Sequence, residues 1–183
     1  MKIADGIYTI ANLLTAEECQ DLIALTEGVG YEAAPITTSG GFVMRPDTRN
    51  NSRVILDDAK RAEALWRRVR AVVPQILEGR QAIGLNERFR FYRYDPGERF
   101  APHIDGPYRR GNGEKSLLSF MVYLNGGFSG GETKFGEVCV TPKTGLGLLF
   151  DHYLLHEGTA VTSGRKYVLR SDVMYGPAGQ LRG

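Results

Sequence analysis

The chain has 183 residues, of which 42% are hydrophobic and 24% are charged, and its formal net charge is +2. These values are ordinary for a globular protein with one sizeable core. The small charge argues against a nucleic-acid-binding protein, which usually carries a strong basic stripe. No apolar run approaches the span of a membrane helix, and residues 1–6 contain no apolar signal segment. We therefore expect a cytoplasmic protein without nucleic-acid or membrane partners; the sequence leaves its oligomeric state open.

Residues 1–80 are expected to be mixed and partly helical. Thr15 and Glu18 have the spacing of a capping box, and apolar residues then recur at helical spacing until Gly28, a plausible stop. A second helix is predicted from about Asp57 to Val73, with Pro74 ending it. Both helices are expected to cover the outside of a sheet.

From about residue 87 the apolar period changes to two, which is typical of strands. In residues 117–124 one predicted face carries Leu118, Phe120, Val122 and Leu124, and the other carries Ser119, Met121 and Tyr123. Short strands between glycine-rich turns indicate a sandwich or jelly roll. We predict a mainly β (α+β) fold with flanking helices. Residues 1–183 would form one domain, in which residues 1–80 support a core at 87–176.

Three residues suggest a metal centre. His103 and Asp105 would point the same way from a strand, and His156 follows 51 residues later. Two imidazoles and one carboxylate can occupy one face of an octahedral metal and leave the other positions open, as in non-heme Fe(II) oxygenases. A His-x-Asp sequence alone occurs often by chance, so the neighbouring motifs decide its meaning.

Four motifs occur in a fixed order around these residues. R-Y-x-x-G-x-x-F-x-x-H-x-D spans residues 93–105, G-G-E-T-x-F spans 130–135, H-E-G spans 156–158, and G-x-K spans 164–166. The set resembles the prolyl 4-hydroxylase-like branch of the Fe(II)/2-oxoglutarate-dependent dioxygenases, and the resemblance covers about residues 88–176. It implies a double-stranded β-helix (jelly roll) core that holds iron in its open mouth.

The resemblance also implies the reaction. Fe(II) would be bound by His103, Asp105 and His156, and 2-oxoglutarate and O2 would be co-substrates. An unactivated C–H bond would be hydroxylated with release of succinate and CO2, and ascorbate would support activity. Related halogenases replace the carboxylate ligand by a small residue, so Asp105 favours hydroxylation.

The distal carboxylate of 2-oxoglutarate needs a cation. Lys166 and Arg170 lie four residues apart and share one face of a strand, whereas Arg165 would point away. The resembling branch uses a lysine ten residues after the distal histidine, which is Lys166; other branches use an arginine nine residues after, which would be Arg165. We favour Lys166 and keep Arg170 as a second candidate, which Asp172 could pair.

Two tyrosines and one histidine need an interpretation. Tyr94 and Tyr123 resemble family tyrosines whose hydroxyls help to hold the 2-oxoglutarate carboxylates. His152 lies four residues before His156 and could compete as the third metal ligand. The match to H-E-G favours His156, so His152 is expected to have a structural role near the site.

The substrate is harder to predict. Arg49, Asn51 and Arg53 lie in a polar segment, residues 45–53, that forms either a surface turn or the substrate entrance, and Arg109 could steer an anion. Residues 106–115 and 37–42 have the glycines of mobile lids. Three functions stay open: hydroxylation of a protein or peptide, most readily at proline; hydroxylation of a free amino acid or other small metabolite; and a cupin-like metal-binding jelly roll without oxygenase activity.

Overall fold

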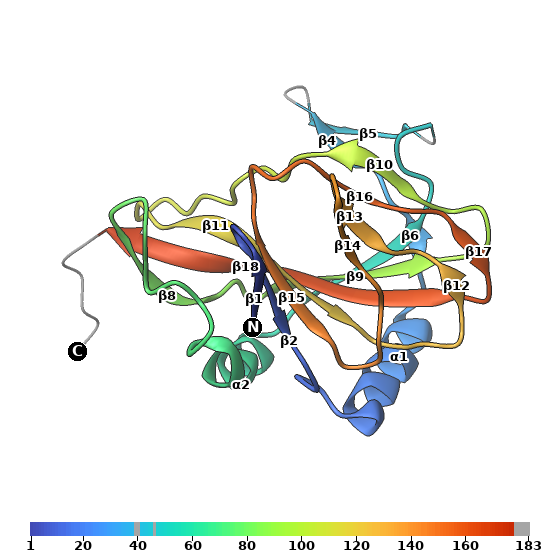
Figure 1. Ribbon diagram of the computed structural model, residues 1–183, viewed down its shortest axis with the longest axis horizontal. Coiled ribbons are helices and arrows are strands. Elements are labelled where there is room, and N and C mark those ends of the chain that lie inside the picture. The colour runs from blue at the N-terminus through green and yellow to red at the C-terminus, as the bar shows by residue number, and fades with distance from the viewer. Residues whose placement is uncertain (39–40, 46, 178–183) are drawn as a thin grey trace.

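The computed structural model describes residues 1–38, 41–45 and 47–177, which form two helices and an extensive set of strands (Figure 1). The helices are α1 (Ala16–Val29) and α2 (Ala59–Val69). The strands are β1 (Lys2–Ala4), β2 (Ile7–Ile10), β3 (Glu32–Ala33), β4 (Ile36–Thr38), β5 (Gly41–Val43), β6 (Ser52–Asp57), β7 (Ile76–Leu77), β8 (Arg80–Leu85), β9 (Arg88–Tyr94), β10 (Phe100–His103), β11 (Lys115–Tyr123), β12 (Ser129–Gly130), β13 (Thr133–Phe135), β14 (Val138–Val140), β15 (Gly147–Asp151), β16 (His156–Gly158), β17 (Val161–Ser163) and β18 (Lys166–Pro177). Among the described residues, neither helix is long and apolar enough to cross a membrane.

The large sheet has the strand order β1-β2-β15-β11-β18-β9-β6-β3, and β8 pairs with β18 beyond the end of β9. The long strand β18 runs through its centre (Figure 1). Strands from residues 1–80 lie at both ends of this order, beside β15 and beside β9. The N-terminal segment therefore contributes strands to the same sheet as the C-terminal half; the single domain stays a prediction.

The smaller sheet, β10-β16-β13-β14, lies against one face of the large sheet. A cluster of buried side chains fills the space between them, with Tyr123, Leu148 and Phe150 from the large sheet and Phe135 and Val140 from the small one. The polar and aromatic face predicted for residues 117–124 points into this space, because Met121 and Tyr123 belong to this cluster. Two antiparallel sheets enclosing a core are the predicted jelly roll, which is confirmed.

The two helices cover the opposite face of the large sheet, as predicted, and lie below it in Figure 1. Cys19 and Leu22 of α1 and Leu65 and Val69 of α2 share a core with Phe120 of the large sheet. The capping box at the start of α1 is present, since the Glu18 amide donates to the Thr15 hydroxyl and the Glu18 carboxylate accepts from the Thr15 amide.

The second helix is shorter than predicted. It begins after Asp58, whose carboxylate caps the Arg61 amide, and its C-cap is Arg70. The amide of Val72 already bonds to the Val69 carbonyl, three residues back, so the helix tightens and ends before the proline. Pro74 also disfavours a helical backbone at the residue before it, which is why Val73 lies outside α2.

Candidate active site

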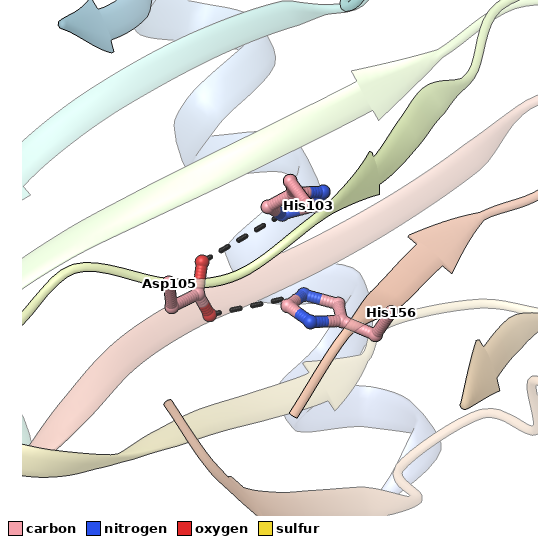
Figure 2. Close-up of side chains that lie close together, drawn as sticks. All are labelled: His103, Asp105 and His156. Atoms are coloured by element: carbon pink, nitrogen blue, oxygen red, sulfur yellow. Dashed lines mark ion pairs between the residues drawn. The ribbon is translucent and has the colours of Figure 1, made fainter. Parts of the chain in front are cut away.

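The three predicted metal ligands come together at one edge of the small sheet (Figure 2). His103 ends β10 and His156 begins β16, and the two residues are direct partners across the antiparallel pair. Asp105 follows two residues after His103, so its carboxylate returns to the same side. One donor atom from each of the three side chains lies within 4.8 Å of the others. The long-range pairing of β10 with β16 therefore builds the cluster that the spacing predicted.

Backbone carbonyls orient both imidazoles. His103 Nδ1 lies 2.8 Å from the Ala101 carbonyl oxygen, and His156 Nδ1 lies 2.9 Å from that of Leu154. An Nδ1–H that donates to a carbonyl leaves the Nε2 lone pair free for a metal. The two Nε2 atoms lie 3.6 and 3.8 Å from the Asp105 carboxylate oxygens, toward which both rings point in Figure 2.

The protonation states also suit a metal. Burial lowers the pKa of His103 to about 4 and lowers that of His156, so both imidazoles are neutral near pH 7. Burial alone would raise the pKa of Asp105, but the Arg170 charge, His156 and the Ser119 hydroxyl hold it well below its usual range. Neutral imidazoles and an ionised carboxylate are the ligating forms of these side chains. The donor set therefore fits Fe(II), with three positions left for other ligands.

A network of hydrogen bonds holds Asp105 in place. Arg170 Nη2 lies 2.9 Å from Asp105 Oδ2, and the Ser119 hydroxyl donates to the same oxygen. The Asp105 amide donates to the His152 carbonyl. The Ser119 oxygen also lies 3.0 Å from His152 Nδ1, and His152 Nε2 lies 2.8 Å from the Ser116 hydroxyl. Both ring nitrogens of His152 are thus engaged by serines, and His152 lies outside the three-residue cluster.

A narrow cavity of about 40 Å³ runs from this cluster to Lys166. Lys166 is 2% exposed, and its ammonium donates to the Gly131 carbonyl at 2.7 Å. Among the described residues no carboxylate lies within ion-pair distance of it, and burial lowers its pKa to about 8. An ammonium carries three donors, and a buried cation without an anion is costly. The end of the cavity is therefore suited to a carboxylate.

The other two candidate cations are already paired. Arg170 bonds to Asp105, and it also contacts Asp172 at 3.4 Å, the pairing that the sequence suggested. Arg165 points away from the cavity, as its register predicts, and pairs with Asp95 at 2.5 Å on the surface. Lys166 is thus the cation of this set that makes no direct ion pair with a described carboxylate, although the more distant Glu132 charge acts on it.

The two predicted tyrosines have different positions. Tyr94 lines the cavity, and its ring centre lies 4.9 Å from Lys166 Nζ. The Tyr123 hydroxyl bonds to Thr133 Oγ1 at 2.7 Å, and Thr133 rather than Tyr123 lines the cavity. Sequence reasoning missed Thr133, although it lies inside the G-G-E-T-x-F motif. It also missed Tyr92, whose pKa falls to about 8 because the charges of Arg49 and Arg170 outweigh its burial.

A second, wider cavity of about 500 Å³ opens on the other side of the cluster, and we call it the groove. Arg49 and Arg53 line it, so this part of the polar segment is not a plain surface turn. Two predicted substrate residues lie elsewhere. Asn51 is buried behind Arg49, where it accepts a hydrogen bond from Arg49 Nε. Arg109 is exposed and outside the groove lining, because its backbone bridges to Lys115.

The two predicted lids lie near this groove. Gly106, Pro107 and Tyr108 of the first lid belong to its lining, and the Tyr108 amide donates to the Ser116 hydroxyl. In the second, β4 and β5 form a hairpin, while Ser39 and Gly40 lie outside the described residues. Their opening and closing stay predictions.

Comparison with known proteins agrees with this geometry. A family model described as the 2OG-Fe(II) oxygenase superfamily matches residues 89–171. A probable prolyl 4-hydroxylase, number 11 of Arabidopsis thaliana, is 27% identical over 158 residues, which cover 74% of this chain and 49% of the plant protein. The chain thus spans about half the length of this curated relative.

Solved structures share the fold at lower identity. A Pseudomonas putida prolyl-4-hydroxylase has a TM-score of 0.70 at 20% identity, with 92% of each chain covered. The viral collagen prolyl hydroxylase of Paramecium bursaria Chlorella virus-1, in its 2OG complex, has a TM-score of 0.64 at 22% identity and covers 94% of this chain and 99% of its own. These likenesses support the double-stranded β-helix.

Proposed function

We propose that the chain is a 2-oxoglutarate-dependent dioxygenase of the 2OG-Fe(II) oxygenase superfamily, in its prolyl hydroxylase-like branch, and that it hydroxylates a protein or peptide at proline. One observation carries the proposal. A cluster of two neutral imidazoles and one carboxylate stands at the head of a narrow cavity that ends at a buried lysine without a direct ion pair among the described residues. A site for a metal and a site for a carboxylate then occur in one cavity, as 2-oxoglutarate requires.

The residues have separate tasks in this proposal. His103, Asp105 and His156 hold Fe(II), and Lys166 binds the distal carboxylate of 2-oxoglutarate, with Tyr94 and Thr133 beside it. When bound, Fe(II) with 2-oxoglutarate and O2 supplies the oxidation that hydroxylates an unactivated C–H bond and releases succinate and CO2. Arg170 and Ser119 keep the Asp105 carboxylate oriented and ionised. Phe100 stacks on the His103 ring, and Phe135 and Phe150 pack against the His156 ring.

The protein substrate is supported by the shape of the second cavity. The groove is wide and reaches the triad from outside, which suits a chain that lies across the mouth better than an enclosed metabolite. The named relatives are prolyl hydroxylases, and the viral one is named for collagen. The alternative is a free amino acid or other small metabolite. A cytoplasmic location and support by ascorbate stay predictions.

The first experiment measures succinate formed from 2-oxoglutarate with Fe(II) and ascorbate, after addition of a cell extract separated by size. We expect the macromolecular fraction to stimulate turnover and to yield residues heavier by one oxygen. Stimulation by the small-molecule fraction alone would favour the metabolite alternative and contradict the protein substrate.

A second experiment separates an oxygenase from a cupin-like metal protein. Binding of 2-oxoglutarate is measured calorimetrically with Mn(II) in place of Fe(II), so that no turnover occurs. Lys166→Ala should weaken 2-oxoglutarate binding and retain Mn(II), whereas His103→Ala should lose Mn(II). Lys134→Ala, which removes an exposed lysine of β13, is the matched control. Unchanged 2-oxoglutarate binding in Lys166→Ala would overturn the role given to that lysine.

A further inference from the structure

The groove outside the triad is strongly cationic. Its lining includes five arginines, Arg49, Arg53, Arg88, Arg90 and Arg170, against two carboxylates, Asp105 and Asp172. Five arginines against two carboxylates give the lining a formal surplus of three positive charges. The whole chain has a net charge of only +2, so this concentration is a local feature of the groove.

The two carboxylates are already neutralised. Arg170 pairs with both of them, and Arg90 contacts Asp172 at 3.3 Å. Arg88 pairs with Asp57, which lies outside the groove lining. Burial and the charges of Arg49 and Arg90 lower the pKa of Arg53, so these cations are close enough to repel one another. An anion in the groove would relieve this repulsion.

Arg49 supplies a second and independent observation. It is 5% exposed, and its guanidinium carbon lies 4.2 Å from the Tyr92 ring centre and 4.5 Å from that of Phe100. Its Nε donates to Asn51, but its Nη2 is buried and has no hydrogen-bond partner among the described residues. A buried donor without an acceptor costs free energy, and each such group calls for an explanation. An acceptor from a bound substrate would satisfy it.

The arginines are also spaced in a way that suits an extended chain. Tyr92, Arg90 and Arg88 are alternate residues of β9 and face the groove, while Phe89 and Phe91 face the helices. Alternate residues of a strand are roughly 7 Å apart, which is also the spacing of alternate side chains in an extended peptide. Tyr92 lies nearest the triad, and Arg90 and Arg88 lead away from it beside Ile55 of β6.

We infer that the groove binds an extended, acidic polypeptide segment, with Asp or Glu side chains at alternate positions next to the residue that is hydroxylated. The inference rests on the proposed function and specifies its substrate class. A single small carboxylate could contact only a few of these arginines, which come from β6, β9, β18 and the segment before β6. The exposed side chains of Ile55 and Ile104 add apolar contacts to the same lining, which suits a peptide better than a nucleic acid.

The test measures binding of ten-residue fluorescent peptides by anisotropy, with Mn(II) and 2-oxoglutarate present. Each peptide has a central proline, flanked at alternate positions by glutamate, glutamine or lysine. We expect the glutamate peptide to bind about tenfold or more tightly than the glutamine peptide, and the difference to shrink in 1 M salt, because exposed charges are then screened. Equal affinities for the glutamate and glutamine peptides would overturn the inference.

Variants locate the effect. Arg53→Glu and Arg88→Glu should each weaken the binding of the glutamate peptide about tenfold and strengthen the binding of the lysine peptide, since each variant replaces a positive charge of the groove by a negative one. Arg109→Glu makes the same charge change on an exposed arginine outside the groove and should leave both affinities unchanged. Equal losses in all three variants would indicate a nonspecific charge effect and contradict the assignment.

Competitors and turnover separate the remaining outcomes. Free glutamate or a single-stranded oligonucleotide that displaces the glutamate peptide at lower concentration than unlabelled peptide would overturn the choice of a polypeptide. Succinate formed from 2-oxoglutarate without any peptide is measured in parallel. If that uncoupled turnover is present while the peptides bind without charge preference, the inference fails and the proposed function survives; if uncoupled and peptide-stimulated turnover are both absent, the proposed function fails.

Discussion

The buried ammonium of Lys166 is unfavourable in the protein without ligand and would be stabilised by a bound carboxylate. Its ammonium is buried and donates to one carbonyl, and burial disfavours the charged form more than the distant Glu132 charge favours it. Gly131 provides that carbonyl, and a Cβ at Gly131 would lie 3.0 Å from the Lys166 side chain. The glycine pair of the G-G-E-T-x-F motif thus leaves room for the lysine that the G-x-K motif supplies.

The lowered pKa of Lys166 predicts two opposite effects of pH. The folded protein releases this proton near pH 8, whereas an unfolded lysine retains it until about pH 10.4. Between these values the unfolded state binds more protons, so stability rises with pH by this contribution. Over the same range 2-oxoglutarate affinity should fall, because the neutral amine attracts a carboxylate weakly.

Urea unfolding and calorimetric binding from pH 7 to 10 check this, with Lys166→Met as the reference that lacks the group. Relative to Lys166→Met, the wild-type free energy of unfolding should increase between pH 8 and 10. A constant difference between the two proteins would show that Lys166 does not titrate in this range.

Ser119 offers a second test among single residues. Its hydroxyl joins Asp105, Arg170 and His152, so its loss should loosen the carboxylate without removing a metal ligand. We expect Ser119→Ala to weaken Mn(II) binding about tenfold, in the range seen when groups behind metal ligands are removed. Ser129→Ala, at an exposed serine, is the control. Unchanged Mn(II) affinity in Ser119→Ala would mean that Arg170 alone orients Asp105.

The sequence predicted those site residues whose positions follow from the alternation of side chains along a strand. For His103 with Asp105, and for Lys166 against Arg165, the face of the strand and the match to the family motifs agreed. Arg49 could not be placed in this way, because it lies beside Phe100 only through an isolated bridge between distant segments. Its partner Asn51 was misplaced for the same reason, since a polar residue in a polar segment gives no sign of burial.

The strands and helices depend on a few close backbone contacts. Gly145 has a φ of +76°, and its carbonyl accepts the amides of Leu13 and Leu14. A Cβ at this position would lie 2.1 Å from the Leu14 carbonyl oxygen. This glycine therefore lets the segment before α1 pack against the turn that leads into β15.

Substitution of this glycine should have a large effect. We expect Gly145→Ala to lower the free energy of unfolding by at least about 2 kcal/mol, since it adds both left-handed strain and a backbone clash. Gly28→Ala is the matched control, because Gly28 lies in α1 with no atom within 4 Å of a Cβ and should gain about 0.5–1 kcal/mol. Urea unfolding of both variants checks this. A loss of less than about 0.5 kcal/mol in Gly145→Ala, or an equal change in the free energy of unfolding of the two variants, would contradict the prediction.

Periodicity predicted the faces of these elements better than their partners. The alternation in residues 117–124 identified both sides of β11, because the jelly-roll interior and the helix-covered face both select side chains at every second position. The pairing of β2 with β15 and of β6 with β9 could not be predicted, since strands of similar composition are interchangeable until loop lengths and packing choose among them.

The whole molecule depends on its N-terminal residues more than the motifs suggest. All the motifs that carry the family resemblance lie between residues 93 and 166. The outer neighbour of β9 is nevertheless β6, and that of β15 is β2, and both come from the N-terminal part of the chain. The core beneath the large sheet consists partly of α1 and α2 side chains. Residues 87–177 alone would expose that apolar face and two strand edges to water.

We therefore predict that a fragment of residues 87–177 does not fold cooperatively by itself. Expressed alone, it should lack a sigmoidal urea transition and should bind neither Mn(II) nor 2-oxoglutarate, although it contains every proposed ligand. Addition of residues 1–86 as a separate chain should partly restore the cooperative urea transition and ligand binding, because the missing strands and helices can dock on the exposed face. A fragment that unfolds cooperatively and binds Mn(II) without the N-terminal chain would show that the motif-bearing half is a domain of its own, and would contradict the single-domain prediction.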